Sequence, residues 1–217
     1  MISPIKEVKN SEIIYLDFNE IPKYYPNYKK IKIFFDDCKK KGIDPKKPEN
    51  RQIFNINFLK KSKKTCLIGR YGENRIEMLK NSHLEKEGRT IHLGIDFFTK
   101  KQTNVYAVAD GELIILDQEK EDHGFGYYAI IKHIINGKNI YSFYGHLAKH
   151  KRKLGKVKKG EIIGKLGNFK ENGGWSIHLH FQLLKQKQKG IPIGYSTKKN
   201  LKKNKILFPD PTNFIII

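Results

Sequence analysis

Residues 173–184 read GGWSIHLHFQLL, and this stretch decides which fold the chain can adopt. Side chains along a β-strand point alternately to its two faces. As a strand, the stretch would place His178 and His180 on one face and Leu179 and Phe181 on the other. The apolar face predicts packing against a hydrophobic core. The two imidazoles on the other face indicate either a pair of metal ligands or two polar side chains left in the core.

Short apolar runs of the same kind fill the chain after Gly88. These runs are residues 90–98, 105–116, 126–135, 140–147, 161–169 and 176–184. Strand-forming residues dominate them, and glycine-containing turns separate them, which is typical of antiparallel strands. The sequence therefore predicts a mainly β fold built from antiparallel sheet.

Residues 1–88 carry signals for both helix and strand. Residues 26–41 carry apolar side chains at spacings of three and four, which predicts a helix. Residues 51–59 and 64–71 are rich in strand formers and predict strands. We therefore expect two parts: residues 1–88, a small α/β extension that packs on the main domain, and residues 89–217, the main β domain with a C-terminal tail.

The chain is strongly basic, with 43 Lys and Arg residues, 22 Asp and Glu residues and a net charge of +21 over 217 residues. Such a charge attracts polyanions. The lysines are spread along the chain, with local runs at residues 149–153 and 198–205. This spread argues against nucleic acid as the main partner and favours contact with an acidic polymer or substrate. The two cysteines form neither a disulfide framework nor a zinc knuckle.

The sequence carries no recognisable targeting segment. The first 20 residues contain no basic segment followed by an apolar run, so we expect no signal peptide. No stretch approaches the roughly 18 consecutive apolar residues of a membrane-spanning helix. The default expectation is a cytoplasmic protein. Export by another route and association with the cell wall are the alternatives.

Two further segments place a histidine near a turn. In HLGIDFF, His92 and Asp96 are four residues apart, so they would share one face of a strand. In FYGHL, His146 follows Tyr144 by two residues and would share its strand face. Each pattern alone is typical of ordinary surface or half-buried side chains. A catalytic zinc ion, however, takes three protein ligands and keeps one position open, which these segments and the histidine pair in residues 173–184 could supply together.

The order and context of these motifs resemble the lysostaphin-type, or LytM-like, zinc metalloendopeptidases. The resemblance covers residues 89–184 and rests on HLGIDF, VYAVADGELI, GYYAIIKH, YGHL, VKKGEIIGKLGN and GGWSIHLHFQL. It implies the family's fold, the duplicated hybrid motif, in which antiparallel β-sheets form a sandwich with a groove. It also implies hydrolysis of a peptide bond, in peptidoglycan or a related peptide, by a zinc-activated water.

The resemblance also implies roles for individual residues. His92, Asp96 and His180 would bind one zinc ion per chain, and His146 and His178 would be the catalytic histidines. Two imidazoles that do not bind the metal can hold and deprotonate the attacking water.

This sequence departs from the family pattern at a few positions. Gln182 replaces a common glutamate, and no tyrosine stands shortly before His92. Some relatives use such a tyrosine to stabilise the transition state, and we expect Tyr144 or Arg70 to contact the substrate instead. Arg75, close to Arg70, is a second candidate for meeting a substrate carboxylate.

Two other functions compete with the peptidase. The first is a non-catalytic LytM-like protein that binds or activates another enzyme, but such proteins typically lose metal ligands, and all five positions are kept here. The second is a basic protein that binds a polyanion, for which binding would depend strongly on salt and not on zinc. The sequence indicates no particular oligomeric state.

Overall fold

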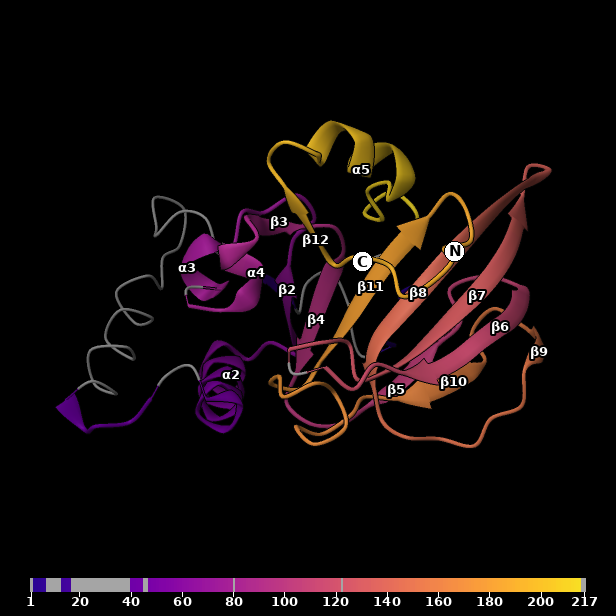
Figure 1. The fold of residues 1–217 in the computed structure, drawn as a ribbon. Coiled ribbons are helices and arrows are strands. Elements are labelled where there is room, and N and C mark those ends of the chain that lie inside the picture. The colour runs from indigo at the N-terminus through magenta and orange to yellow at the C-terminus, as the bar shows by residue number, and fades with distance from the viewer. Residues whose placement is uncertain are drawn as a thin grey trace.

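The computed structural model describes residues 2–6, 13–16, 40–44, 47–79, 81–121 and 123–215, and its main feature is one eight-stranded sheet (Figure 1). The strands of this sheet, in spatial order, are β1 (Ile13–Leu16), β2 (Cys66–Gly69), β4 (Ile95–Thr99), β11 (His178–Leu184), β8 (Lys138–Leu147), β7 (Tyr127–Ile135), β6 (Gly111–Gln118) and β9 (Gly155–Val157). All these neighbours pair antiparallel except β1 and β2, which pair parallel. The prediction of a mainly β, antiparallel fold is confirmed.

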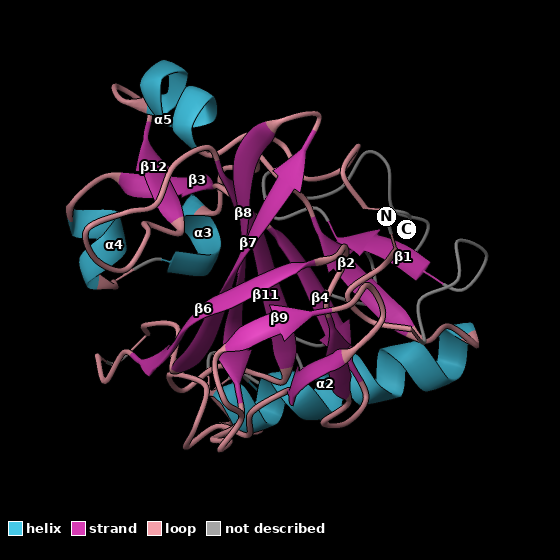
Figure 2. Cartoon of the chain, turned by 90° about the vertical axis from the view of Figure 1, so that its right-hand side faces the viewer, coloured by secondary structure: helices cyan, strands magenta, loops and turns pink. Residues whose placement is uncertain are grey.

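Two small antiparallel sheets accompany the large one. One pairs β5 (Asn104–Tyr106) with β10 (Ile162–Lys165), and the other pairs β3 (Arg89–His92) with β12 (Tyr195–Thr197). Three short helices lie near the β3–β12 sheet: α3 (Ile76–Leu79), α4 (His83–Lys86) and α5 (Leu201–Leu207). Figure 2 shows these helices at one end of the molecule, with α2 (Pro48–Ser62) on a different side.

The predicted strand at residues 173–184 is β11, and its alternation works as expected. Leu179 and Phe181 are buried in the main hydrophobic core, whereas His178 and His180 face the other side of the sheet. On the neighbouring strand β4, Asp96 lies opposite His180 in the pairing register. The sheet thus brings a carboxylate and an imidazole together from segments 84 residues apart.

The hairpin between β7 and β8 also follows from the sequence. Its turn is Asn136-Gly137, and both residues have positive φ, 50° and 72°. A two-residue turn with left-handed angles matches the natural twist of paired strands, and Asn-Gly is the sequence that adopts it most readily. This turn sets the register that carries β8 back toward β11.

Residues 51–59 form part of helix α2, so the strand predicted there is wrong. Pro48 stands at the start of α2, Glu49 in its first turn, and Lys63 closes it with a left-handed conformation. The buried side chains of this segment are Gln52, Asn55 and Leu59, at spacings of three and four. The end signals and this helical periodicity outweighed the local preference of the residues for β structure.

Other parts of the N-terminal region can be compared with the sequence predictions only in part. The strand predicted at residues 64–71 is confirmed as β2, whereas the helix predicted at residues 26–41 lies almost entirely outside the described residues. β2 extends the large sheet beside β4, and α2 contacts both strands. The domain boundary near residue 88 stays a prediction. No helix among the described residues has the length and apolar character needed to cross a membrane.

Candidate metal centre and active site

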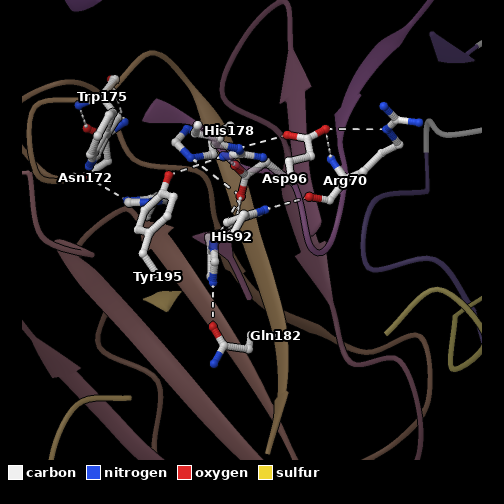
Figure 3. A network of polar contacts seen from close by, with 12 residues as sticks. Arg70, His92, Asp96, Asn172, Trp175, His178, Gln182 and Tyr195 are labelled. Carbon is white, nitrogen blue, oxygen red and sulfur yellow. Dashed lines mark hydrogen bonds and ion pairs between the residues drawn. The ribbon is translucent and has the colours of Figure 1, made fainter. Parts of the chain in front are cut away.

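Three side chains named from the sequence converge at one point. His92 ends β3, Asp96 lies in β4 and His180 lies in β11. Figure 3 shows the side chains of His92 and Asp96 close to one another. His92 Nε2 is 3.0 Å from His180 Nδ1 and 3.3 Å from Asp96 Oδ1, and His180 Nδ1 is 3.0 Å from Asp96 Oδ1. Donors about 2.0–2.1 Å from a tetrahedral zinc ion would be roughly 3.3–3.4 Å apart. The three donor atoms therefore have nearly the spacing that a zinc ion requires.

The second nitrogen of each histidine fixes which nitrogen can bind a metal. His92 Nδ1 is 3.0 Å from the Arg70 carbonyl oxygen, and His180 Nε2 is 2.9 Å from Gln182 Oε1. The Gln182 amide is oriented by its own donation to the Ile193 carbonyl, at 3.2 Å. Because both oxygens accept hydrogen bonds, these nitrogens carry the protons. The lone pairs of His92 Nε2 and His180 Nδ1 remain available to a metal, as in many metal sites.

A buried arginine binds the carboxylate oxygen of Asp96 that does not face the two histidines. Arg75 donates from Nη1 to Asp96 Oδ2 at 2.5 Å and from Nε to Glu73 Oε2 at 2.9 Å. Burial alone would raise the pKa of Asp96, but the electrostatic interactions with His92 and with the Arg75 guanidinium bring it well below its usual value. Asp96 is therefore ionised, with Oδ1 turned toward the two histidines.

Burial also keeps the metal-binding imidazole of His92 neutral. Burial first, and then the charge of Arg75, lower the pKa of His92 to about 4. A neutral imidazole is the form that binds metals. The donor set is two imidazoles and one carboxylate, which suits a divalent ion such as zinc.

His146 and His178 lie beside these donors and are not part of the triad. Their ring centroids are 4.3 Å apart, and His178 Nε2 is 4.0 Å from Asp96 Oδ1. His146 Nδ1 is 2.8 Å from the Asn172 carbonyl and His178 Nδ1 is 2.7 Å from the Ser176 carbonyl, so both Nδ1 atoms donate. Burial lowers the pKa of both histidines. Each therefore presents an unprotonated Nε2.

His146 reaches the site through an unusual backbone conformation. In the register of β8 and β11, Gly145 lies opposite His180, and Tyr144 lies opposite Phe181 on the core side. Regular alternation would turn His146 to the core as well. Its φ of 65° breaks the alternation and brings its ring within 4.3 Å of the His178 ring. A left-handed angle is uncommon for residues other than glycine, which makes it informative here.

The prediction that Tyr144 shares a face with His146 and contacts substrate is wrong. Tyr144 is fully buried, and its hydroxyl lies 3.2 Å from both Val108 N and Ser142 Oγ. Its ring packs on Phe181 in the main core. The left-handed residue at His146 separates the two faces, which a simple period of two cannot anticipate.

The two arginines named from the sequence take different positions. The side chain of Arg70 is about half exposed, with Nε 3.5 Å from Glu73 Oε1, and the described cleft lining does not include it. Its backbone carbonyl is the group that serves the site, by accepting from His92. Arg75, expected to meet substrate, is instead buried behind Asp96.

An open cleft lies over the centre. Its lining includes Phe125, Trp175 and the segment Gly194-Tyr195. The triad residues Asp96 and His180, and both His146 and His178, line the cleft, so a bound ligand could reach them.

Gly94 allows the turn between β3 and β4 to approach the triad. A Cβ atom at this position would lie 2.6 Å from Cε1 of the His180 ring, closer than real contacts allow. The glycine in HLGID is therefore needed for His92 and His180 to come together.

Sequence reasoning missed two residues of the site. Gln182 was noted only as a departure from the family pattern, yet it orients His180. Tyr195 lines the cleft, with its hydroxyl 3.3 Å from Arg75 Nη1 and its ring 5.4 Å from the His92 ring. No local motif marks Tyr195, because only the pairing of β12 with β3 brings it opposite His92.

The fold and this site define a mainly β protein with a candidate centre for a single metal ion. Residues 90–193 match the model of Peptidase family M23, and over this segment the chain is LytM-like. The chain is also 27% identical over 118 residues to the DD-carboxypeptidase/endopeptidase Mpg of Neisseria meningitidis serogroup B. That match covers 54% of this chain but 26% of the relative, so the chain spans about a quarter of the length of the curated relatives it matches.

Solved structures give similar matches. The catalytic domain of the antimicrobial peptidase lysostaphin from Staphylococcus simulans is 28% identical, with a TM-score of 0.42, over 58% of this chain and 79% of that one. The structure of LytU is 30% identical, with a TM-score of 0.41, over 57% of this chain and 72% of that one.

Proposed function

We propose that this protein is a zinc-dependent metalloendopeptidase that hydrolyses a peptide bond in peptidoglycan or a related peptide. The observation that carries the proposal is the convergence of His92, Asp96 and His180 next to two neutral histidines in an open cleft. Membership of a peptidase family supports the reaction class. The choice of peptidoglycan rests on the resemblance to that family.

His92 Nε2, Asp96 Oδ1 and His180 Nδ1 would hold the zinc ion, with Arg70, Arg75 and Gln182 fixing the orientation of these ligands. A bound zinc ion would polarise the scissile carbonyl and lower the pKa of the attacking water. The triad supplies three protein ligands, the number that leaves one position for water or substrate.

His146 and His178 would move the protons of the reaction. Because both Nδ1 atoms donate to backbone carbonyls, each Nε2 can accept a proton from the attacking water. Their lowered pKa values keep both rings neutral at the start of the reaction. The histidine that takes the proton can then deliver it to the leaving amine, as general acid–base catalysis requires.

The experiment that tests this function measures zinc content and peptide hydrolysis together. We expect the wild-type protein to bind about one zinc ion, since the site has one set of three donors. His180→Ala should lose both zinc and hydrolysis of wall-derived peptides, whereas His178→Ala should keep zinc and lose hydrolysis. Absence of zinc binding in the wild type, with zinc in excess, would refute the proposal.

The same experiment separates the alternatives. A LytM-like binding or activator protein would bind wall fragments without hydrolysing them. A polyanion-binding protein would need no zinc, and its binding would weaken strongly with salt. Contact of the lysine runs with an acidic polymer, and the cytoplasmic or wall-associated location, stay predictions.

A further inference from the structure

The cleft is lined by charged side chains of both signs. Arg51 from α2 and Arg89 from β3 line it, and both lie outside the family match at 90–193. Glu119 and Glu121 line it as well. Arg75 also lines the cleft, but its guanidinium is bound to Asp96 and Glu73. Arg51 and Arg89 are therefore the arginines that can meet a ligand.

Arg51 is held at the cleft by its neighbour Gln52. The Gln52 amide donates to the Thr99 carbonyl at 3.0 Å and accepts from the Ile177 backbone N–H at 2.8 Å. These bonds fasten α2 to the end of β4 and to the residue before β11. Arg51, the residue before Gln52, lines the cleft together with His178.

The guanidinium of Arg51 lacks a carboxylate partner within the described part of the chain. Among the described residues, no hydrogen bond or ion pair reaches this guanidinium, and only the electrostatic effects of Tyr195 and Asp44 act to raise its pKa. Burial, and the neighbouring charge of Arg75, lower the pKa of Arg51. A partly desolvated cation beside another cation is a favourable place for an anionic ligand.

Arg89 supplies a second group of donors. Its Nη1 donates to Glu87 at 2.9 Å, whereas its Nε is buried and has no hydrogen-bond partner in the described structure. A buried donor without a partner costs free energy until a ligand satisfies it. Arg89 lines the same cleft as Arg51.

We propose that Arg51 and Arg89 form a carboxylate-binding subsite, and that the preferred substrate is a peptide with a free carboxylate close to the scissile bond. The planar guanidinium matches a carboxylate in geometry as well as charge. A polyanion that filled the cleft would also meet Glu119 and Glu121, which line it, whereas a single carboxylate needs only the two arginines. The inference rests on the proposed peptidase function for the position of the scissile bond.

The test compares three synthetic peptides of the wall stem type: one with a free C-terminus and one glutamate, its C-terminal amide, and its glutamine analogue. Binding to the full-length wild-type protein is measured by titration calorimetry and by the initial fluorescence change of Trp175. Trp175 is the single tryptophan of the chain, and it lines the cleft. Hydrolysis of each peptide is followed separately by chromatography.

We expect loss of the recognised carboxylate to weaken binding about tenfold, the scale of a charge-assisted contact. The peptide that loses affinity identifies the source, terminal or side-chain. Arg51→Gln and Arg89→Gln should weaken binding of the free acid and remove its advantage over the amide. Arg152→Gln is the matched control, because Arg152 pairs with Glu161 outside the cleft lining and its loss should change nothing.

Equal affinity for all three peptides, or no binding of any, would overturn the subsite. If the free acid binds best but no peptide is hydrolysed when zinc is present, the proposed peptidase function fails while the subsite stands. If all peptides are hydrolysed with equal efficiency and equal affinity, the peptidase function stands and the subsite fails.

Discussion

Arg75 and Asp96 form a buried ion pair in which the arginine binds the carboxylate oxygen that faces away from the two histidines of the triad. Asp96 Oδ2 accepts from Arg75 Nη1 at 2.5 Å, while Asp96 Oδ1 is 3.0 Å from His180 Nδ1. The pair leaves the carboxylate charged and fixes its rotation. The orientation of the proposed zinc ligand therefore depends on a residue that does not itself touch the metal.

Replacement of Arg75 tests this dependence. Arg75→Gln would leave Asp96 and Glu73 as two buried carboxylates without their shared cation. We expect zinc affinity to fall about 10–100-fold, the usual effect of losing a group that orients a metal ligand. Loss of one partner from a buried ion pair should also lower the free energy of unfolding by about 3–5 kcal/mol. Competition with a chelating dye and chemical denaturation measure the two effects, and unchanged zinc affinity in a folded variant would contradict the interpretation.

Gln182 offers a second test of ligand orientation. Gln182→Leu would remove the acceptor of the His180 Nε2 proton, so we expect zinc affinity to fall at least about tenfold. Gln182→Glu keeps an acceptor toward His180 and loses only the donation to the Ile193 carbonyl. It should therefore retain most of the affinity. Equal zinc binding by the Leu and Glu variants would argue that Gln182 has no such role.

The left-handed conformation of His146 predicts a separation of stability from activity. A glycine adopts a φ of 65° without strain, whereas an alanine does not. We expect His146→Gly to be more stable than His146→Ala by about 1 kcal/mol, the cost of a left-handed angle for a residue with a Cβ. Both variants should keep zinc and lose hydrolysis, because both lack the imidazole. A more stable alanine variant would indicate that the backbone relaxes at this position.

The buried histidines predict acid sensitivity of the metal-free protein. Burial lowers the pKa of His92, His133, His146 and His178. In the unfolded chain a histidine has a pKa of about 6.5, so below that pH the unfolded chain takes up protons that the folded chain does not. The folded state is therefore favoured above about pH 6.5 and loses stability as pH falls, by up to about 1.4 kcal/mol per pH unit for each such histidine.

His133 allows this prediction to be checked away from the metal ligands. It is fully buried, with Nδ1 2.8 Å from the Asp110 carbonyl and Nε2 2.7 Å from Ser142 Oγ. Unfolding free energies of the metal-free wild type and of His133→Gln should be compared between about pH 7 and pH 5. The variant should lose less stability over this interval than the wild type. An identical slope would show that His133 does not stay neutral in the folded state.

The sequence predicted the convergence of the candidate metal ligands better than it predicted the helix α2 and the residues around the site. The alternation in residues 173–184 was sufficient to place His178 and His180 on one face. His92 and Asp96 do converge on His180, but they lie in the separate strands β3 and β4 and not on one strand face, as their four-residue spacing predicted. The alternation is a local pattern, and the pairing of β4 with β11 then places Asp96 directly opposite His180. The catalytic and metal-binding roles stay predictions, whereas the convergence of the residues is observed.

The failures have identifiable causes. Residues 51–59 contain strand-forming side chains, but their buried positions follow the period of a helix. Tyr144 and His146 lie on opposite faces because His146 itself has a left-handed backbone conformation. The residue types at these positions do not predict that conformation. Arg75 lies outside the strands of the large sheet, and its backbone N–H donates to the Thr90 carbonyl of β3. Its contact with Asp96 joins segments 21 residues apart, which no local pattern predicts.

Gln52 fastens α2 to the sheet through backbone groups alone: the carbonyls of Thr99 and Lys100 and the N–H of Ile177. Backbone groups are the same for nearly every residue, so these three hydrogen bonds do not depend on the side chains of the strands they join. Substitutions at the exposed positions of α2 would therefore leave this anchor intact. The surface of the helix can be altered without moving β4 and β11, the strands that carry Asp96 and His180.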